Sequence, residues 1–527
     1  MKRKTIFLFL YLLWIIPLGF SQETLPRKLD IPAGTGVSWW VGIINQGQLM
    51  PVQNGYEADL HDNYGNQVQP LLISDHGEVV WSEIPYKLSR RQDTLHLVSD
   101  EASLQYKKAG TTLREAFLYA SKTWFPASGK MPDPLLFSEP QFNTWIELTY
   151  NQNQNDILKY ATDIIRNGFA PGVLMIDDNW QEDYGKWDFH PGRFPDPGAM
   201  MDSLHHMGFK VMLWICPFVS PDCDVFRQLE EKGMLLKNDR GKTAIIPWWN
   251  GYSGELDLSN PKTFLWFKQQ LNRLQEKYGV DGFKFDAGDF EFYKNTRSYG
   301  NVTPQEQCEL YAKIGLDYPL NEYRANWKMA GQPLVNRLRD KYHTWEDLNK
   351  LIPDILLQGI VGYNFTCPDM VGGGDYVSFL PGHSMDPELI VRSAQCHALM
   401  PMMQFSAAPW RILDKEHFAA VEKAVQIRKE YTPVILRLAR ESAITGEPVV
   451  RPLEYVFPHH GYAAVNDQFM LGDSILVAPV LQKGLTERTV ILPPGRWKNR
   501  QGKKFNGNKK ITVPVSLEDI PVFFRIH

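Results

Sequence analysis

The middle of the chain alternates short apolar runs with segments whose apolar residues recur at helical spacing. Four apolar runs have the length of buried strands, at residues 142–148, 173–177, 210–216 and 282–286. Three amphipathic segments accompany them, at residues 156–166, 199–206 and 261–277. Strands and helices in alternation are typical of parallel βαβ units, so we predict an α/β domain over residues 131–435. Later strands are expected from three further apolar runs, at residues 334–336, 360–365 and 399–405.

This periodicity alone fits both a closed barrel and an open, doubly wound sheet. No glycine-rich phosphate loop follows the first strand, which disfavours a nucleotide-binding version of the open sheet. The flanking regions, residues 22–130 and 436–527, have short alternating runs between Gly, Pro, Asn and Asp turns. We therefore predict a β-sandwich before the α/β domain and an all-β module after it.

The first 21 residues have the layout of a signal peptide. Three basic residues among the first four precede an apolar run over residues 5–18, and Gly19 and Ser21 suit cleavage before Gln22. The alternative is a membrane anchor, but a spanning helix needs about 20 apolar residues. No later stretch of the sequence is apolar for long enough to span a bilayer. We expect residues 1–21 to be removed and the mature chain to be periplasmic or secreted.

Composition narrows the range of partners. Lys and Arg number 56 against 60 Asp and Glu, and a net charge of −4 without a basic stripe argues against nucleic acid. The 16 Trp, 22 Tyr and 28 Phe supply flat rings that can stack on sugars, although most of them belong to the core. The five Cys lack metal-ligand spacing, and a Cys216–Cys223 disulfide is left open. The sequence carries no interface signal, so a homo-oligomer is also left open.

Acidic residues follow three of the expected strands. Asp177 and Asp178 follow one strand, Asp286 ends another and Asp369 follows a third, while Trp214 lies near the end of a fourth. The carboxyl ends of barrel strands meet at one rim, where clustered carboxylates repel unless they bind a ligand. Sugar hydroxyls suit them, because ionised carboxylates accept hydrogen bonds and an indole stacks on the ring. A divalent metal is the rival explanation, but no His accompanies the acids at ligand spacing, and we predict no metal.

Several segments resemble glycoside hydrolase family 31. Residues 283–288 (Phe-Lys-Phe-Asp-Ala-Gly) resemble the family's nucleophile motif, and residues 248–251 (Trp-Trp-Asn-Gly) resemble its Trp-Trp-x-Gly element. In the C-terminal region, residues 448–453, 467–473 and 476–480 resemble three of the family's sequence motifs and occur in the same order. The resemblance implies a (β/α)8 TIM barrel with an N-terminal β-sandwich and a C-terminal all-β module. It also implies a retaining, exo-acting α-glycoside hydrolase that acts on an oligosaccharide or glycoside without a cofactor.

The resemblance implies two catalytic aspartates. Asp286 matches the nucleophile, and the family's spacing of 29 residues back from Asp369 places the acid/base at Asp340. A further 16 residues back lies Arg324, which matches a substrate-binding arginine. The full set of implied substrate-binding residues is Asp177, Asp178, Trp145, Trp214, Lys284, Arg324, Arg337 and Asp369.

Charges near these aspartates lead to two expectations. The negative charge of Asp286 should hold Asp340 partly protonated, as a general acid requires. Either neighbouring arginine, Arg337 or Arg339, would weaken that role by pointing at Asp340. Lys284 lies two residues before Asp286 on the same strand face, and we expect it to keep Asp286 ionised.

The chain departs from the family's α-glucosidases and α-xylosidases at Pro368, where those enzymes carry a His. The combination of Asp177, Asp178, the 284–288 segment and Pro368 resembles the branch that contains α-galactosidases. Adjacent carboxylates offer acceptors for the axial O4 and the O6 of galactose. We predict an α-galactosidase, with an α-glucosidase or α-xylosidase, a transglycosylase and a catalytically idle carbohydrate-binding protein as alternatives.

Overall fold

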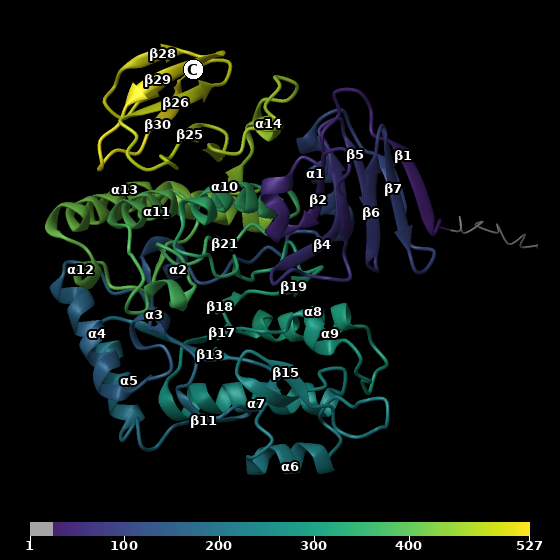
Figure 1. Cartoon of the computed structure of the whole chain (residues 1–527), viewed down its shortest axis with the longest axis vertical. Helices are drawn as coiled ribbons and strands as arrows, with labels where there is room; N and C mark the ends of the chain where they lie inside the picture. The colour runs from purple at the N-terminus through teal and green to yellow at the C-terminus, as the bar shows by residue number, and fades with distance from the viewer. Residues whose placement is uncertain (1–24, 527) are drawn as a thin grey trace, which may run out of the picture.

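The computed structural model describes residues 25–526, so the predicted signal peptide lies outside the described residues. Its centre is an eight-stranded parallel sheet in the order β21-β20-β18-β17-β13-β10-β9-β22 (Figure 1). In chain order the strands are β9 (Gln141–Asn143), β10 (Val173–Ile176), β13 (Lys210–Ile215), β17 (Gly282–Phe285), β18 (Leu320–Tyr323), β20 (Asn336–Arg337), β21 (Thr366–Cys367) and β22 (Gln404–Phe405). A parallel bridge between Met370 and Gln404 joins the two end strands. The predicted TIM barrel is confirmed.

Six helices follow barrel strands, and each begins at a residue whose side chain accepts a backbone hydrogen bond. They are α4 (Gln154–Arg166), α5 (Pro197–His206), α7 (Pro261–Tyr278), α9 (Pro304–Ile314), α10 (Trp345–Ile360) and α11 (Pro387–Ala398). Their N-caps are Asn, Asp or Thr, and four of them have Pro in the first turn, where no intrahelical donor is lost. The sequence thus fixes where each of these helices starts.

The barrel departs from the predicted elements in its second half and at its first strand. The run 142–148 is not one strand, because β9 ends at Asn143 and a helical turn, α3 (Trp145–Leu148), follows. The run 360–365 mostly follows the end of α10, and the strand there is β21. Strand β18 was not predicted, since it carries Asn321 and Glu322 and lacks an apolar run. Inward polar side chains on short strands hide the signal that buried strands usually give.

The N-terminal region forms two sheets beside the barrel, drawn in purple and blue in Figure 1. One is antiparallel, in the order β1-β7-β6-β3, and the other runs β19-β4-β5-β8 with β2 on β4. The strands are β1 (Lys28–Pro32), β2 (Trp39–Ile43), β3 (Glu57–Asp59), β4 (Gln67–Ser74), β5 (Glu78–Trp81), β6 (Tyr86–Arg91), β7 (Thr94–Ser99), β8 (Gln105–Lys108) and β19 (Asn326–Trp327). Strand β19 comes from the barrel segment between β18 and β20, so the two domains share a sheet. The region also contains a helix, α1 (Leu113–Trp124), where only strands were expected.

The C-terminal region is the predicted all-β module. Its larger sheet runs β23-β24-β25-β30-β27-β28, and β26 pairs with β29. The strands are β23 (Val450–Arg451), β24 (Phe469–Leu471), β25 (Ile475–Val477), β26 (Glu487–Leu492), β27 (Arg496–Asn499), β28 (Lys504–Asn506), β29 (Lys509–Pro514) and β30 (Val522–Ile526). Helix α13 (Lys415–Thr445) lies between this module and the barrel and runs through the expected boundary at residue 435 (Figure 1).

Two smaller findings complete the fold. All five cysteines are buried and free, so the Cys216–Cys223 disulfide is absent. Within residues 25–526, no helix has both the length and the apolar character needed to cross a membrane.

Candidate active site

A pocket of about 340 Å³ opens at the carboxyl end of the barrel strands. Eight of the ten residues predicted for the site line it. They are Asp177 and Asp178 after β10, Trp214 on β13, Lys284 and Asp286 at β17, Arg324 after β18, Trp145 and Asp340. The other two, Arg337 and Asp369, lie behind Asp340. Five lining residues were not predicted for the site: Tyr150, Trp249, Gly374, Asp375 and Tyr376.

Asp286 is the most constrained carboxylate in the pocket. Trp214 Nε1 donates to its Oδ2 at 2.9 Å, and Arg324 Nε donates to its Oδ1 at 3.0 Å. The backbone N–H of Ala287 donates to Oδ1 at 3.0 Å, from a residue with a positive φ of 59°. Burial alone would raise the pKa of Asp286, but the charges of Arg324, Lys284 and Arg337 hold it well below its usual range. The side chain is therefore an ionised carboxylate with a fixed orientation.

Lys284 is paired with Asp177 rather than directly with Asp286. Its Nζ lies 2.7 Å from Asp177 Oδ2, and both side chains are almost fully buried. Its charge still lowers the pKa of Asp286, so the expected effect on the nucleophile is present without a hydrogen bond. A buried pair of this kind fixes both groups, because either one alone would be an uncompensated charge.

Asp178 occupies a different environment from its neighbour Asp177. It accepts a hydrogen bond from Tyr184 Oη at 3.0 Å and another from Asn250 Nδ2 at 2.6 Å. Burial and the charge of Asp177 raise the pKa of Asp178 to about 7. The deep end of the pocket thus holds one carboxylate paired to a lysine and one carboxyl that is partly protonated at neutral pH.

Asp340 lies at the open end of the pocket, with 45% of its side chain exposed. Arg337 Nη1 donates to its Oδ1 at 2.6 Å and also to Asp369 Oδ1 at 3.1 Å. Arg339 turns away toward the Tyr64 carbonyl. Of the two neighbouring arginines, it is therefore Arg337 that points at Asp340, the arrangement expected to weaken its acid role.

Asp369 anchors the loop behind Asp340. Its Oδ2 accepts from the backbone N–H groups of Lys341 at 2.8 Å and Gly374 at 3.0 Å. Burial and the charge of Asp340 raise the pKa of Asp369 to about 7. A Cβ at Gly374 would lie 2.6 Å from Asp369 Oδ1 and 2.8 Å from Asp340 Oδ1, so only glycine fits there. Asp369 is a positioning residue and does not line the pocket.

Aromatic side chains form the mouth. Trp145, Tyr150 and Tyr376 meet edge to face, with ring centroids 5.2–6.0 Å apart, and Trp145 Nε1 donates to the Gly374 carbonyl at 3.2 Å. Such rings present both an apolar face and a polar edge to a sugar. On another side of the pocket, the Arg324 guanidinium lies 5.2 Å from the ring centroid of Trp249.

The sequence carried a signal for only some of the unpredicted lining residues. Trp249 lies in the Trp-Trp-Asn-Gly motif, which pointed to it without assigning a role. Tyr150 and Tyr376 come from loops more than 200 residues apart and carry no such signal.

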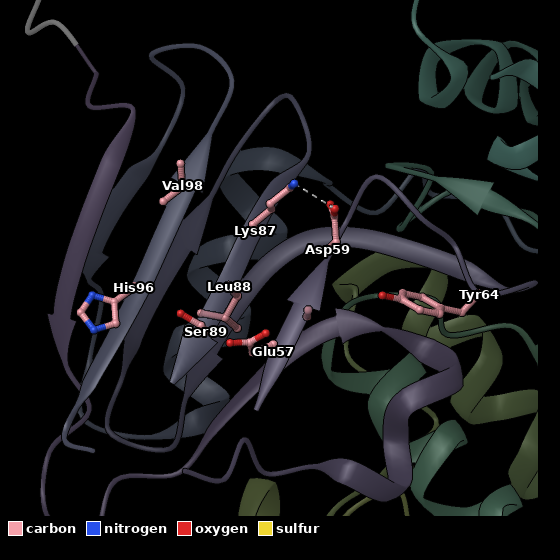
Figure 2. A pocket seen from close by; sticks show the side chains of 9 residues that line it. Glu57, Asp59, Tyr64, Lys87, Leu88, Ser89, His96 and Val98 are labelled. Atoms are coloured by element: carbon pink, nitrogen blue, oxygen red, sulfur yellow. Dashed lines mark ion pairs between the residues drawn. The ribbon is translucent and has the colours of Figure 1, made fainter. Parts of the chain in front are cut away.

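A second hollow lies on the outer sheet of the N-terminal domain (Figure 2). Its acids are solvated: Glu57 and Asp59 are 69% and 39% exposed, and Asp59 pairs with Lys87 at 3.5 Å. Figure 2 shows His96 and Tyr64 at opposite sides of the view, away from that pair. Exposed groups on a sheet face have neither the burial nor the convergence that tunes catalytic carboxyls. The barrel pocket is the candidate active site.

Asp178 gives a testable pH dependence of stability. Its pKa of about 7 in the folded chain exceeds the usual value of 3.8, so its contribution to stability is fully present below about pH 4, where the carboxyl is protonated in both the folded and the unfolded state. That contribution is lost as the pH rises from about 4 to 7. We expect the Tm of Asp178→Asn, measured relative to that of the unsubstituted chain, to increase over this range. Calorimetry at pH 4, 5, 6 and 7 measures the difference, and a constant difference would contradict the assignment. Asp369 titrates in the same range but contributes equally to both proteins.

Two models of one protein family match the chain. Residues 135–438 match the TIM-barrel domain of glycosyl hydrolases family 31, and residues 446–526 match the family's C-terminal domain. The chain belongs to glycosyl hydrolase family 31.

The chain is similar in sequence to relatives that are named for different activities. The chain is 33% identical to the mouse myogenesis-regulating glycosidase over 428 residues, which cover 78% of this chain and 59% of that protein. It is 23% identical to an α-xylosidase of Emericella nidulans over 519 residues, covering 90% and 64%. The chain therefore spans about three fifths of the length of these two relatives.

Solved structures show the same fold. A family 31 dextranase of Flavobacterium johnsoniae superposes with a TM-score of 0.83 at 20% identity, covering 94% of this chain and 66% of that chain. A soil-metagenome α-xylosidase gives 0.81 at 22% identity, covering 94% and 79%.

Proposed function

We propose that the chain is a retaining, exo-acting α-glycoside hydrolase with Asp286 as nucleophile and Asp340 as acid/base. The observation that carries this is Asp286 itself, a carboxylate only 14% exposed that is held ionised and oriented inside a sugar-sized pocket by contacts that include Trp214 and Arg324. The deep end of that pocket is closed by Asp177, Asp178 and Lys284, which supports removal of a terminal sugar.

The reaction proceeds in two displacements. Asp286 forms a bond to the anomeric carbon while the bond to the leaving oxygen breaks, and Asp340 gives its proton to that oxygen. Water then attacks the same carbon from the opposite face, passes a proton to Asp340, and displaces the Asp286 carboxylate. Arg337 Nη1 donates to Asp340 Oδ1 at 2.6 Å and so fixes the orientation of this carboxyl.

For the sugar, we propose an α-D-galactoside. The neighbouring side chains of Asp177 and Asp178 at the closed end offer acceptors for both O4 and O6, and Pro368 stands where α-glucosidases and α-xylosidases of the family carry a His. The second candidate is an α-glucoside or α-xyloside. Two relatives support it: the α-xylosidase of Emericella nidulans and a 1,3-α-isomaltosidase of Kribbella flavida that is 26% identical to this chain. We also propose export of the mature chain, based on the first 21 residues.

Matched 4-nitrophenyl α-D-galactoside, α-D-glucoside and α-D-xyloside test the proposal. A galactoside preference that is lost in Asp286→Asn would support both the sugar and the nucleophile. Preference for either other sugar would keep the mechanism and remove the galactoside proposal. If a folded protein turned over none of the three, a carbohydrate-binding protein without activity would be the better account.

Asp177→Ala is expected to impair both binding and folding. It removes an acceptor from the deep end of the pocket and leaves the buried Lys284 ammonium unpaired. We expect kcat/KM to fall about 10²-fold, mainly through KM, and the free energy of unfolding to fall by about 3–5 kcal/mol. Asp188→Ala is the control, since its partners Arg273 and Lys277 are partly exposed and such pairs contribute below about 1 kcal/mol. Unaltered kinetics in Asp177→Ala would exclude Asp177 from the site.

A further inference from the structure

The segment that carries Asp340 has no regular secondary structure of its own. It lies between β20, which ends at Arg337, and α10, which begins at Trp345. Within residues 25–526, Arg337 is the one side chain that hydrogen-bonds to Asp340. A general acid must lie within hydrogen-bond reach of the oxygen that it protonates. The place of the Asp340 carboxyl therefore depends on what fixes the backbone on either side of it.

Lys341, the residue after Asp340, has a partner for each of its polar groups. Its backbone N–H donates to Asp369 Oδ2 at 2.8 Å, and its carbonyl accepts from the Asp375 N–H at 3.1 Å. Its Nζ donates to Asp354 Oδ2 at 2.6 Å, in the middle of α10. Both side chains of this ion pair are buried. Burial raises the pKa of Asp354, and the charge of Lys341 acts against that rise, so each group compensates the other.

The N-terminal domain binds the other oxygen of Asp354. The 3-10 helix η1 (Ile44–Leu49) packs on α10, and the backbone N–H of Gly47 donates to Asp354 Oδ1 at 3.1 Å. A Cβ at Gly47 would lie 2.6 Å from backbone atoms of Asp354, so the two backbones are in direct contact. The Asp354 carboxylate thus joins the N-terminal domain to Lys341.

The same domain also holds the residues before Asp340. The buried side chain of Asn66 accepts from the Arg339 N–H at 3.0 Å and donates from Nδ2 to the Arg337 carbonyl at 3.1 Å. Gln67 Nε2 donates to the same carbonyl at 2.8 Å. The backbone is therefore fixed on both sides of Asp340, directly by Asn66 on one side and through the Asp354 carboxylate on the other.

We propose that Asn66 and the Lys341–Asp354 pair are positioning residues for Asp340, through which the N-terminal domain holds the acid/base in place. This inference rests on the proposed hydrolase function and deepens it. None of the three side chains lines the pocket, so their effect on catalysis is exerted through the place of the Asp340 carboxyl. A displacement of about 1 Å in a reacting group can lower the rate about 10²-fold.

Lys341→Met is the first test variant, because it keeps the length of the side chain and removes the bond to Asp354. The substrates are melibiose and 4-nitrophenyl α-D-galactoside, or maltose and 4-nitrophenyl α-D-glucoside if the chain prefers glucose. A displaced acid matters most where the leaving oxygen needs a proton. We expect kcat/KM to fall roughly 10–10²-fold on the disaccharide and to stay within about threefold on the nitrophenyl glycoside.

Asn66→Ala is the second test variant and acts from the other domain. It is expected to show the same selective loss on the disaccharide. Asn66 Nδ2 also lies 3.3 Å from the Arg324 carbonyl, but that carbonyl keeps a donor in Gln67 Nε2 at 2.6 Å, so the nucleophile side of the pocket is retained. This variant gives the result if Lys341→Met does not fold.

Leu271→Ala is the control for a loss of stability alone. Leu271 is buried on α7 and does not line the pocket, and its truncation leaves a cavity in the core. We expect it to lower the Tm, measured by calorimetry, without changing the ratio of kcat/KM between the two substrates.

The outcomes distinguish the positioning role from the hydrolase proposal. Equal losses on both substrates, or unchanged kinetics, in a folded Lys341→Met or Asn66→Ala protein would overturn the positioning role, while turnover by the unsubstituted chain upheld the hydrolase. Absence of turnover of every glycoside by the unsubstituted chain would overturn both.

Discussion

Replacing Asp286 with Asn is expected to lower kcat by roughly 10⁴-fold or more on every glycoside, because no carboxylate is left to form the glycosyl intermediate. The amide is close to isosteric, and its single oxygen can still accept a hydrogen bond from either Trp214 or Arg324. Steady-state kinetics with the best nitrophenyl glycoside measures the loss, and circular dichroism confirms that the variant is folded. Near-normal turnover in a folded Asp286→Asn protein would end the nucleophile assignment.

A second replacement at the same residue separates a nucleophile from a residue that only stabilises charge. Asp286→Gly removes the side chain and opens space beside the anomeric carbon. Added azide is expected to restore turnover of an activated glycoside and to yield a glycosyl azide of inverted configuration, since the small anion attacks where the carboxylate did. Asp188→Asn, a change at a partly exposed acid away from the pocket, serves as the control and should neither lose activity nor respond to azide.

Asp340→Ala has the second largest expected effect, and its size depends on the leaving group. Natural glycosides need protonation of a poor leaving oxygen, so kcat/KM should fall about 10²–10⁴-fold. A 4-nitrophenyl leaving group needs little protonation, and its first step should fall about tenfold or less. The side chain is 45% exposed, so folding should be little affected. Equal losses on both substrate types would show that another group is the acid.

Arg337 makes this second experiment more informative. Its Nη1 is shared between Asp340 and the buried Asp369, and its Nε lies 3.2 Å from Glu322 Oε1. Loss of the Asp340 side chain leaves Arg337 with two buried acids, so its charge stays compensated. Any change in activity can then be assigned to the missing carboxyl rather than to an unpaired guanidinium.

The sequence predicted the barrel best where strands are buried and apolar on both faces. Strands β13 and β17 fall on predicted runs, because Val, Met, Leu, Trp and Phe leave a clear signal. Strand β18 does not, since Glu322 points into a polar barrel interior and Asn321 bonds to backbone groups of the adjoining segments. Residue Glu322 accepts a hydrogen bond there from Gln404 at 2.8 Å, a partner that is 82 residues away and invisible to periodicity.

The features of the site likewise divide into those that the sequence predicted and those that it did not. Asp177, Asp178 and Asp286 were predicted because strand ends converge on one rim, a property of the fold. The sequence did not predict that Lys284 pairs with Asp177 or that Arg337 contacts Asp340. The direction of a side chain depends on packing from several elements at once. The Trp145–Tyr376 contact joins two short helical turns that are far apart in the sequence.

The most direct test of the central claim is to trap the intermediate on Asp286. The chain is incubated with 5-fluoro-α-D-galactosyl fluoride, and with the glucosyl analogue in parallel, and its peptides are analysed by mass spectrometry. The account predicts one fluorosugar bound to the peptide that contains Asp286, and no label in Asp286→Asn. A label on another residue, or no label on a chain whose first product has the inverted configuration, would contradict it.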